Sequence, residues 1–343
     1  MPAIQTRGLT KRYGRFTAVD RLDLVVEEGE IFGLLGSNGA GKTTTIQMLT
    51  TLTRPSGGTA RIYGHDIRIK PREVRKHIGA VSDGINLYPD LSLHQNLHFF
   101  GRGYGLRGHR LEARVDDVLS RVDLLDWQDE PLGTYSFGMR KRAQIAVALV
   151  HEPKVLFMDE ATTGIDPQNS IRIRNLVQEL AAEGMTIVWT THMMEEPERL
   201  CDRVAIMSRG KVRALGKPYE LARMIEKEKT IEIRAQRDAN PEQVRFMAGV
   251  LRRRGLPVID GDWRSGAVKL VVAKDFDMGD LMAVTDRFGY IHSINTIGPS
   301  LEDVFIHYTT IGSDKGPAEE PKSKEGQAAT GTRRGRPSAA ARK

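Results

Sequence analysis

Short, continuous apolar runs recur along the first two thirds of the chain, and each leads into a loop that contains glycine, proline or acidic residues. Four of these runs cover residues 31–35, 78–81, 155–160 and 185–190. Apolar runs of this length, without polar alternation, are typical of strands buried on both faces of a parallel sheet. Helical periodicity follows the first run. The pattern therefore predicts an α/β fold.

The pattern changes after about residue 226, where strand-like and helix-like segments follow in the order β-α-β-β-α-β. The six segments cover residues 230–235, 241–255, 256–260, 267–273, 278–289 and 290–297. This order is that of the ferredoxin-like α+β sandwich, so we expect residues 226–312 to form a small C-terminal domain. Such a domain could be a packing or dimer-stabilising appendage, or it could hold a regulatory ligand. Its sequence contains no cluster of His, Cys or acidic residues with metal-ligand spacing.

The last segment, residues 313–343, is basic and has no hydrophobic pattern. It contains eight Lys or Arg against four Asp or Glu, and it lacks Val, Ile, Leu, Met and aromatic residues. Such a segment cannot bury a core, so we expect a disordered basic tail. The tail is either simply solvated or weakly attracted to anionic lipid or nucleic acid. The remainder of the chain is near charge balance, so no specific binding of nucleic acid is expected.

The cysteine content and the lengths of the apolar runs indicate the cellular compartment and the relation to a membrane. The 343 residues include one cysteine, Cys201, so no disulfide framework forms within the chain and a reducing compartment fits best. No run approaches the roughly 18 consecutive apolar residues of a membrane helix. The first residues lack the apolar region of a signal peptide. We therefore expect any action at a membrane to need a partner.

The first apolar run leads directly into a glycine-rich phosphate-binding pattern. Residues 36–44 read GSNGAGKTT, which contains G-x-x-x-x-G-K-[ST]. Glycines let backbone N–H groups converge on phosphate oxygens, and the positive end of the following helix points toward them. Lys42 can reach the β- and γ-phosphates, and the Thr43 hydroxyl can hold Mg²⁺. The candidate nucleotide-binding residues are Gly36, Ser37, Asn38, Gly39, Ala40, Gly41, Lys42, Thr43 and Thr44.

The run at 155–160 ends in two carboxylates, Asp159 and Glu160. Because α/β sheets place ligand chemistry at the carboxyl ends of their strands, both side chains are expected beside the phosphate loop. Asp159 is the natural partner for Mg²⁺. Glu160 is placed to polarise a water molecule against the γ-phosphate. The combination predicts a site that binds a phosphorylated nucleotide with Mg²⁺ and directs water at its γ-phosphate.

Further motifs follow in a fixed order along the chain. They read KRYG at 11–14, YSFGMRKR at 135–142 and TTGIDP at 162–167, and His192 lies just past the run at 185–190. With the phosphate loop and the two carboxylates, this set resembles the ATP-binding subunits of ABC transporters. The resemblance implies a P-loop NTPase fold of the ABC ATPase type, with a helical signature subdomain, over residues 1–225.

The resemblance also implies roles for residues outside the phosphate loop. Tyr13 would stack on the adenine ring, and His192 would contact the γ-phosphate and sense its loss. Asp166 would lie in the loop that crosses between subunits. The signature, which in this family caps the γ-phosphate bound by the opposite subunit, would comprise Ser136, Gly138 and Met139. Because one chain carries one phosphate loop and one signature, two ATP molecules would be sandwiched in a homodimer or in a pair of ATPase subunits.

The chain departs from the family pattern at four positions. Ser37 and Ala161 stand where proline is usual, and Phe137 takes the first glycine position of the signature. None of these three changes removes a functional group, so we expect an active site. Asp83 stands where the family normally has a glutamine. It is either a turn residue or, as the resemblance favours, a Mg²⁺ ligand in the loop that meets the coupling helix of the membrane subunit.

The segment PSLEDVF at 299–305 resembles a closing segment of ABC-2-type exporter ATPases, particularly the daunorubicin/doxorubicin-resistance group. We therefore interpret the chain as an ATP-binding and ATP-hydrolysing subunit, with ATP and Mg²⁺ as cofactors. It would power an exporter through a separate multi-helix permease at the cytoplasmic face of the cell membrane. The alternatives are a soluble ABC ATPase or a nucleotide-dependent switch that acts on nucleic acid or another protein complex. The cargo is not encoded here, because the family contacts cargo through the membrane subunit.

Overall fold

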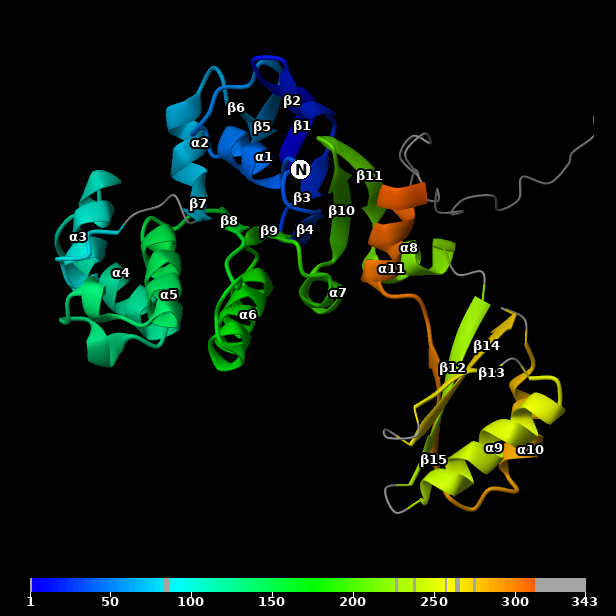
Figure 1. The fold of residues 1–343 in the computed structure, drawn as a ribbon. Coiled ribbons are helices and arrows are strands. Elements are labelled where there is room, and N and C mark those ends of the chain that lie inside the picture. The colour runs from blue at the N-terminus through cyan, green and yellow to red at the C-terminus, as the bar shows by residue number, and fades with distance from the viewer. Residues whose placement is uncertain are drawn as a thin grey trace, which may run out of the picture.

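Three sheets organise the part of the chain that the structure describes (Figure 1). The computed structural model describes residues 2–82, 87–225, 228–236, 239–256, 258–262, 266–273 and 276–311. Asp83 and the expected basic tail at 313–343 lie outside the described residues.

A largely parallel sheet forms the centre of the larger domain. Its order is β11-β10-β4-β9-β8-β7, and β11 runs antiparallel to β10. In that order the strands are Lys211–Gly216, Arg203–Ser208, Ile31–Leu35, Thr186–Thr191, Val155–Asp159 and Ile78–Val81. The apolar runs noted in the sequence form β4, β7, β8 and β9, which confirms the α/β prediction.

Both faces of this sheet are buried, as the continuous apolar runs predict. Along β8, Leu156 and Met158 belong to one core cluster, whereas Val155 and Phe157 belong to the other. All four side chains are fully buried. This double burial holds the carboxyl ends of the strands in place, and the residues that follow them form the site described below.

An antiparallel sheet lies over one face of the central sheet and shares its second core cluster. Its strands are β1 (Pro2–Tyr13), β2 (Phe16–Leu22), β3 (Val25–Glu27), β5 (Gly57–Ile62) and β6 (His65–Asp66). Helices α1 (Lys42–Leu49) and α2 (Pro71–His77) belong to the same side of the domain. The hairpin of β1 and β2 pairs Tyr13 with Phe16 at its end.

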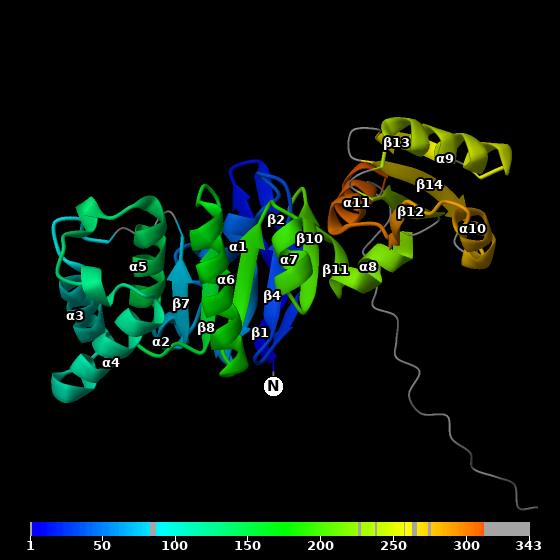
Figure 2. The same ribbon diagram turned by 90° about the horizontal axis from the view of Figure 1, so that it is seen from below.

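Helices cover the other face and extend beyond β7 as a helical subdomain (Figures 1 and 2). They are α3 (Leu93–Gly103), α4 (Gly108–Arg121), α5 (Phe137–Leu149), α6 (Pro167–Ala182) and α7 (Glu195–Leu200), with 3₁₀ turns at Leu125–Trp127 and Leu132–Thr134. Polar N-caps fix where several of them begin. Ser92 and Gln95 form a capping box at α3, and Asp166 accepts from the Asn169 amide at α6.

The small C-terminal domain has the ferredoxin-like topology expected from the sequence. Its antiparallel sheet has the order β13-β14-β12-β15, with β13 at Val258–Asp262, β14 at Ala267–Ala273, β12 at Glu228–Ala235 and β15 at Ile291–Ile297. Helices α9 (Pro241–Arg253) and α10 (Met278–Thr285) connect the strands. This domain has its own core, in which Ile231, Leu251 and Leu270 are fully buried.

The chain then returns to the larger domain. Helix α11 (Leu301–Ile306), which continues into a π-helical turn at His307–Ile311, packs against α8 (Pro218–Ile225) and α7 (Figure 1). Leu301 and Val304 are fully buried in the same core cluster as Leu200 and Leu221. Both ends of the small domain are therefore attached to the larger one.

Candidate active site

The phosphate loop, residues 36–44, connects β4 to α1 at the carboxyl end of the parallel strands. Gly41 has φ 108°, and a Cβ added there would lie 2.5 Å from the Ala18 carbonyl oxygen, so only glycine fits. Lys42 follows as the first residue of α1, and its Nζ donates to the Gly36 carbonyl at 2.7 Å and to the Ser37 carbonyl at 3.3 Å. The ammonium group therefore lies inside the loop.

Asp159 ends β8 and faces the start of α1. Its Oδ1 accepts a hydrogen bond from Thr190 Oγ1 at 2.5 Å and one from Thr43 Oγ1 at 3.4 Å. Thr190 lies on the adjacent strand β9, so the carboxylate joins two strands and the helix. Carboxylate and hydroxyl oxygens are the donors that Mg²⁺ prefers. Thr43 and Asp159 therefore form a donor pair that fits a magnesium ion.

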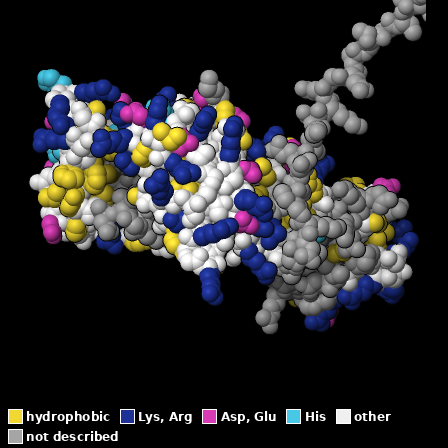
Figure 3. Space-filling view, turned by 90° about the horizontal axis from the view of Figure 1, so that it is seen from above, with side chains coloured by type: hydrophobic (Ala, Val, Ile, Leu, Met, Phe, Trp, Pro, Cys, Tyr) yellow, Lys and Arg dark blue, Asp and Glu magenta, His cyan; other side chains and the backbone are white. Residues whose placement is uncertain are grey.

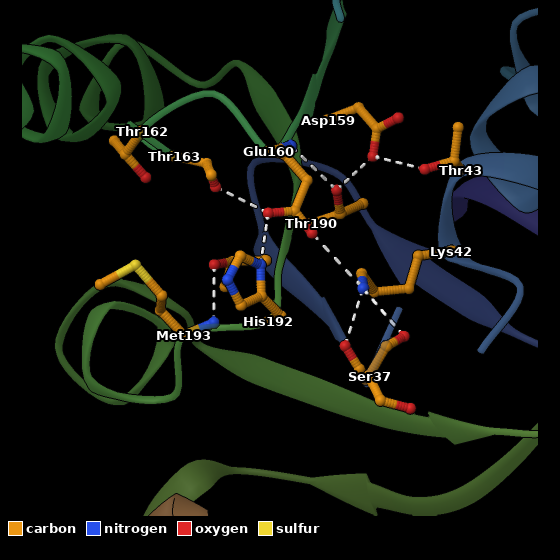
Figure 4. Close-up of polar contacts among 12 residues, drawn as sticks. Ser37, Lys42, Thr43, Asp159, Glu160, Thr162, Thr163, Thr190, His192 and Met193 are labelled. Atoms are coloured by element: carbon orange, nitrogen blue, oxygen red, sulfur yellow. Dashed lines mark hydrogen bonds and ion pairs between the residues drawn. The ribbon is translucent and has the colours of Figure 1, made fainter. Parts of the chain in front are cut away.

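Glu160 lies directly after β8, at the centre of the polar contacts in Figure 4. Its Oε2 accepts from Thr163 Oγ1 at 2.7 Å and is 2.7 Å from His192 Nδ1, while Oε1 is 3.4 Å from Lys42 Nζ. Its φ of 52° is uncommon for a residue other than glycine. A hydrogen bond from its amide to the Thr190 carbonyl at 3.2 Å holds the turn. The backbone thus directs the carboxylate toward the phosphate loop.

The contacts of Glu160 also determine its charge. Burial of the carboxyl group favours the neutral form and raises its pKa, but hydrogen bonds from Thr163 and His192, together with the Lys42 ammonium, outweigh burial. The pKa of Glu160 therefore lies below its ordinary value. The side chain is ionised at neutral pH and can accept a hydrogen bond from water.

The phosphate loop, Glu160, Thr163 and His192 line one cavity of about 430 Å³. The cavity is lined by Tyr13, Phe16, Ala18, Ser37, Asn38, Gly39, Ala40, Gly41, Lys42, Thr43, Thr44, Glu160, Thr163 and His192. Tyr13 and Phe16 are 48% and 63% exposed, so two aromatic rings are free to receive a flat ligand. The Lys11 ammonium lies 5.0 Å from the centre of the Tyr13 ring. The cavity thus joins an aromatic end to a phosphate-binding end.

The signature residues and Asp166, which were also expected at the site, lie outside this cavity. Ser136 caps α5 by accepting from the Met139 amide at 3.3 Å, and neither residue lines the cavity. Gly138 lies against the side chain of Asn169. A Cβ added at Gly138 would lie 2.6 Å from Asn169 Nδ2. Asn169 Nδ2 in turn donates to Asp166 Oδ2 at 2.7 Å. The signature and the start of α6 therefore form a second polar surface.

Sequence reasoning missed three residues of the site: Phe16, Thr163 and Thr190. Phe16 could have been inferred from the turn at Gly14, which makes it the hairpin partner of Tyr13. Thr163 lies in the quoted motif TTGIDP, where its spacing of three residues from Glu160 was the available signal. Thr190 carries no motif, because a hydroxyl at the end of a buried strand has the same sequence pattern as a structural threonine.

The fold and the cavity define a P-loop nucleotide-hydrolysing domain, and comparison with known proteins specifies the family. The ABC transporter family profile matches residues 19–163. The daunorubicin resistance ATP-binding protein DrrA2 of Streptomyces coeruleorubidus is 35% identical over 320 residues, which are 93% of this chain and 98% of that protein. The Nod factor export ATP-binding protein I of Ralstonia nicotianae is 44% identical over 220 residues, which are 64% of this chain and 68% of that protein.

Solved structures agree with this relationship. A dimeric post-hydrolysis state of an ATP-binding cassette, bound to ADP and phosphate, is 25% identical with a TM-score of 0.57 and covers 62% of this chain and 98% of that chain. The chain belongs to the ABC transporter family, as an ATP-hydrolysing subunit of the export type. The soluble ATPase and the switch are not favoured by these relatives. None of the described helices combines the length and apolar character needed to cross a bilayer.

Proposed function

We propose that two copies of this chain bind two ATP molecules between them and hydrolyse ATP to drive a membrane permease. The observation that carries this proposal is the division of the expected nucleotide contacts over two surfaces. The phosphate loop, Glu160 and His192 line one cavity, whereas Ser136 and Met139 lie outside it. A facing copy would bring its signature to the phosphates bound by the first. The dimeric, ADP-bound relative supports this arrangement.

The second polar surface has the chemistry required to contact phosphate across such an interface. The first turn of α5 leaves backbone N–H groups without helical partners, and these groups bind anions. Phe137 at this turn is 45% exposed, and the neighbouring loop residue Asp166 is exposed as well. We therefore assign the starts of α5 and α6 to the subunit interface.

At each nucleotide site, the side chains of this chain would have different roles in hydrolysis. Thr43 and Asp159 would hold Mg²⁺, whose charge neutralises phosphate oxygens when it is bound. Lys42 would turn from Glu160 toward the β- and γ-phosphates. Glu160, already ionised, would orient the attacking water and accept its hydrogen bond. His192 would hold the carboxylate in position and reach the γ-phosphate.

The adenine base would lie at the aromatic end of the cavity, against Tyr13 and Phe16. Stacking contributes about 1–3 kcal/mol per base and depends little on which base is present. Affinity for ATP would then come from the phosphates, and we expect weak discrimination between purine nucleotides.

The permease would dock on the helical subdomain. A groove of about 910 Å³ runs beside α3, with Leu91, Phe99, Phe100 and Tyr104 among its lining residues. Phe99 and Tyr104 are 52% and 45% exposed. Figure 3 shows hydrophobic side chains gathered at this end of the molecule. A cytoplasmic helix of a membrane subunit would cover them, and the chain would then be peripheral to the membrane at its cytoplasmic face.

The compound that is exported would be selected by the permease. The names of two relatives concern daunorubicin resistance and Nod factor export. We extend to this chain the role in export. We assign no particular cargo, because the cavity and the groove described above are attributed to the nucleotide and to the permease.

A Glu160→Gln substitution tests the catalytic part of the proposal. The variant should bind ATP and dimerise, because its shape and the phosphate loop are retained, but steady-state Mg-ATPase activity should fall by about 10²- to 10⁴-fold. Glu179→Gln, at an exposed position of α6, is the matched control and should keep wild-type turnover. Unchanged hydrolysis by Glu160→Gln would contradict the assigned role.

Two further measurements test the partners. Size-exclusion chromatography of Glu160→Gln with ATP should show a dimer, and a monomer at saturating ATP would contradict the nucleotide sandwich. The wild-type chain, extracted in mild detergent, should co-purify with a multi-helix membrane protein. Phe99→Asp should reduce this recovery without changing the ATPase activity of the isolated chain.

A further inference from the structure

Three potential metal ligands converge on the helical subdomain. They are His94 and His98 on α3 and Glu112 on α4, and one ligand atom from each lies within 4.8 Å of the other two. The imidazole rings have centroids 4.4 Å apart, and His98 Nε2 is 3.1 Å from Glu112 Oε2. Among the residues that the structure describes, no other group of three His, Cys, Asp or Glu has this geometry.

The helices hold these side chains on one surface. His94 and His98 are four residues apart, so they project from the same face of α3. Leu93 and Leu97 are fully buried on α3, and Leu111 anchors α4 next to Glu112. A Cβ added at Gly101 would lie 2.5 Å from Leu111 Cδ1, which shows how closely the two helices approach. Close packing thus sets the distance between the histidines and the carboxylate.

The three groups leave a nitrogen atom unsatisfied. His98 Nε2 is buried and makes no hydrogen bond to any described residue. It reaches Glu112 at an ion-pair distance without hydrogen-bond geometry. A buried imidazole nitrogen that makes no aligned hydrogen bond costs free energy, and a bound cation that shares the carboxylate would remove this cost.

The three ligand atoms indicate which kind of cation the site would bind. Two imidazole nitrogens and one carboxylate oxygen are ligands of divalent transition metals and not of Mg²⁺ or Ca²⁺, which take oxygen ligands. Zinc binds such a set at about 2.0–2.2 Å, with a fourth position for water. The side chains are half-buried or exposed, so rotations about their χ angles can draw the three atoms together. We propose that His94, His98 and Glu112 bind a divalent transition-metal ion of the zinc class.

A metal ion bound by these three side chains would cross-link α3 to α4. His94 and His98 also line the groove beside α3, so an ion bound there would lie next to the surface assigned above to the permease. That consequence rests on the proposed function. The metal site itself does not, because it requires only the three side chains.

Zinc titration of the full-length chain without a histidine tag tests the site, with affinity and stoichiometry measured by calorimetry. The wild type should bind one Zn²⁺ per chain, and Co²⁺ in its place should give the visible absorption of a protein-bound ion. His98→Ala should weaken binding by about 100-fold or more and Glu112→Gln by at least about 10-fold, because each removes a ligand, and loss of a group that merely orients a ligand already costs about 10- to 100-fold. Circular dichroism in EDTA checks that the variants are folded, and Glu112→Gln covers the case in which His98→Ala fails to fold.

The chain provides a matched control. His65 and His77 form a second histidine pair, with stacked rings 5.2 Å apart. His65→Ala should leave zinc affinity unchanged. Loss of binding in His65→Ala, wild-type affinity in both Glu112→Gln and His98→Ala, or no saturable binding by the wild type would each overturn the proposal. ATPase activity measured in parallel would not decide it, so the site can fail while the proposed function stands.

Discussion

Thr190 shows how much of the site depends on a residue that no motif marks. Its hydroxyl donates to Asp159 Oδ1, and its hydroxyl and carbonyl oxygens both lie 3.2 Å from the Glu160 amide. One buried threonine therefore orients both acidic residues. The sequence predicted the phosphate loop, Asp159 and Glu160, because their chemistry requires fixed residue types at fixed spacings, and the family resemblance added His192. It did not predict Thr190, since its role depends on which strand lies beside β8.

Thr190→Val should raise the Mg²⁺ concentration that ATP hydrolysis requires, because Asp159, the carboxylate proposed to hold the metal, loses the hydroxyl that orients it. Loss of such a supporting contact costs about 10- to 100-fold in metal affinity or activity. The ATPase rate measured against Mg²⁺ concentration should shift to higher Mg²⁺ and recover in part at saturation. Thr186→Val, at the other end of the same strand, removes a hydroxyl that accepts from the Gly29 amide and is the control. A Thr190→Val curve that superimposes on the wild type would refute the assignment.

His151 connects three elements just after α5 ends. Its Nε2 donates to the Ile78 carbonyl of β7 at 2.9 Å, and its ring stacks on Tyr104, after α3, with centroids 3.7 Å apart. Burial lowers the pKa of His151 to about 4, and Nδ1 has no hydrogen-bond partner among the described residues. Protonation of Nδ1 would place a positive charge at a buried position where none of the described residues accepts a hydrogen bond from it. The helical subdomain is therefore attached to the sheet partly through a neutral imidazole.

This contact predicts a pH dependence of stability. Between pH 6.5 and about 4 the unfolded chain binds a proton at His151 that the folded chain does not, so the free energy of unfolding falls as the pH falls. The contribution is complete above pH 6.5 and amounts to about 3 kcal/mol if it is lost in full. Urea unfolding of His151→Gln from pH 7 to 4.5 should show a shallower decline than the wild type. His109→Gln, at an exposed position, should follow the wild type. Parallel curves for His151→Gln and wild type would contradict the prediction.

At the scale of the whole molecule, the return of the chain through α11 is the feature that the sequence did not reveal. The periodicity identified the elements of the small domain and their order, because amphipathic strands and helices carry local patterns. The burial of Leu301 and Val304 against Leu200 and Leu221 depends on contacts between distant segments. No local pattern encodes which core an apolar pair will join, so the sequence grouped 299–305 with the small domain.

Leu301→Ala should destabilise the larger domain and not only the small one. The side chain is fully buried, and such truncations cost about 2–5 kcal/mol. Differential scanning calorimetry with and without ATP identifies the transition of the nucleotide-binding domain, and that transition should move to lower temperature. Leu281→Ala, fully buried in the small domain, is the control and should move the other transition. If Leu301→Ala left the ATP-sensitive transition in place, α11 would not be part of that core.

The late position of α11 has a consequence for how the protein is made. The apolar face of α8 is synthesised roughly 75 residues before the helix that covers it. At about 5–20 residues per second, the ribosome needs roughly 4–15 s to bridge that interval. During this time Leu221 is without its Leu301 and Val304 neighbours. The nascent nucleotide-binding domain therefore passes through a stage in which chaperones or like chains can reach its core, and that stage closes only when the small domain has left the ribosome.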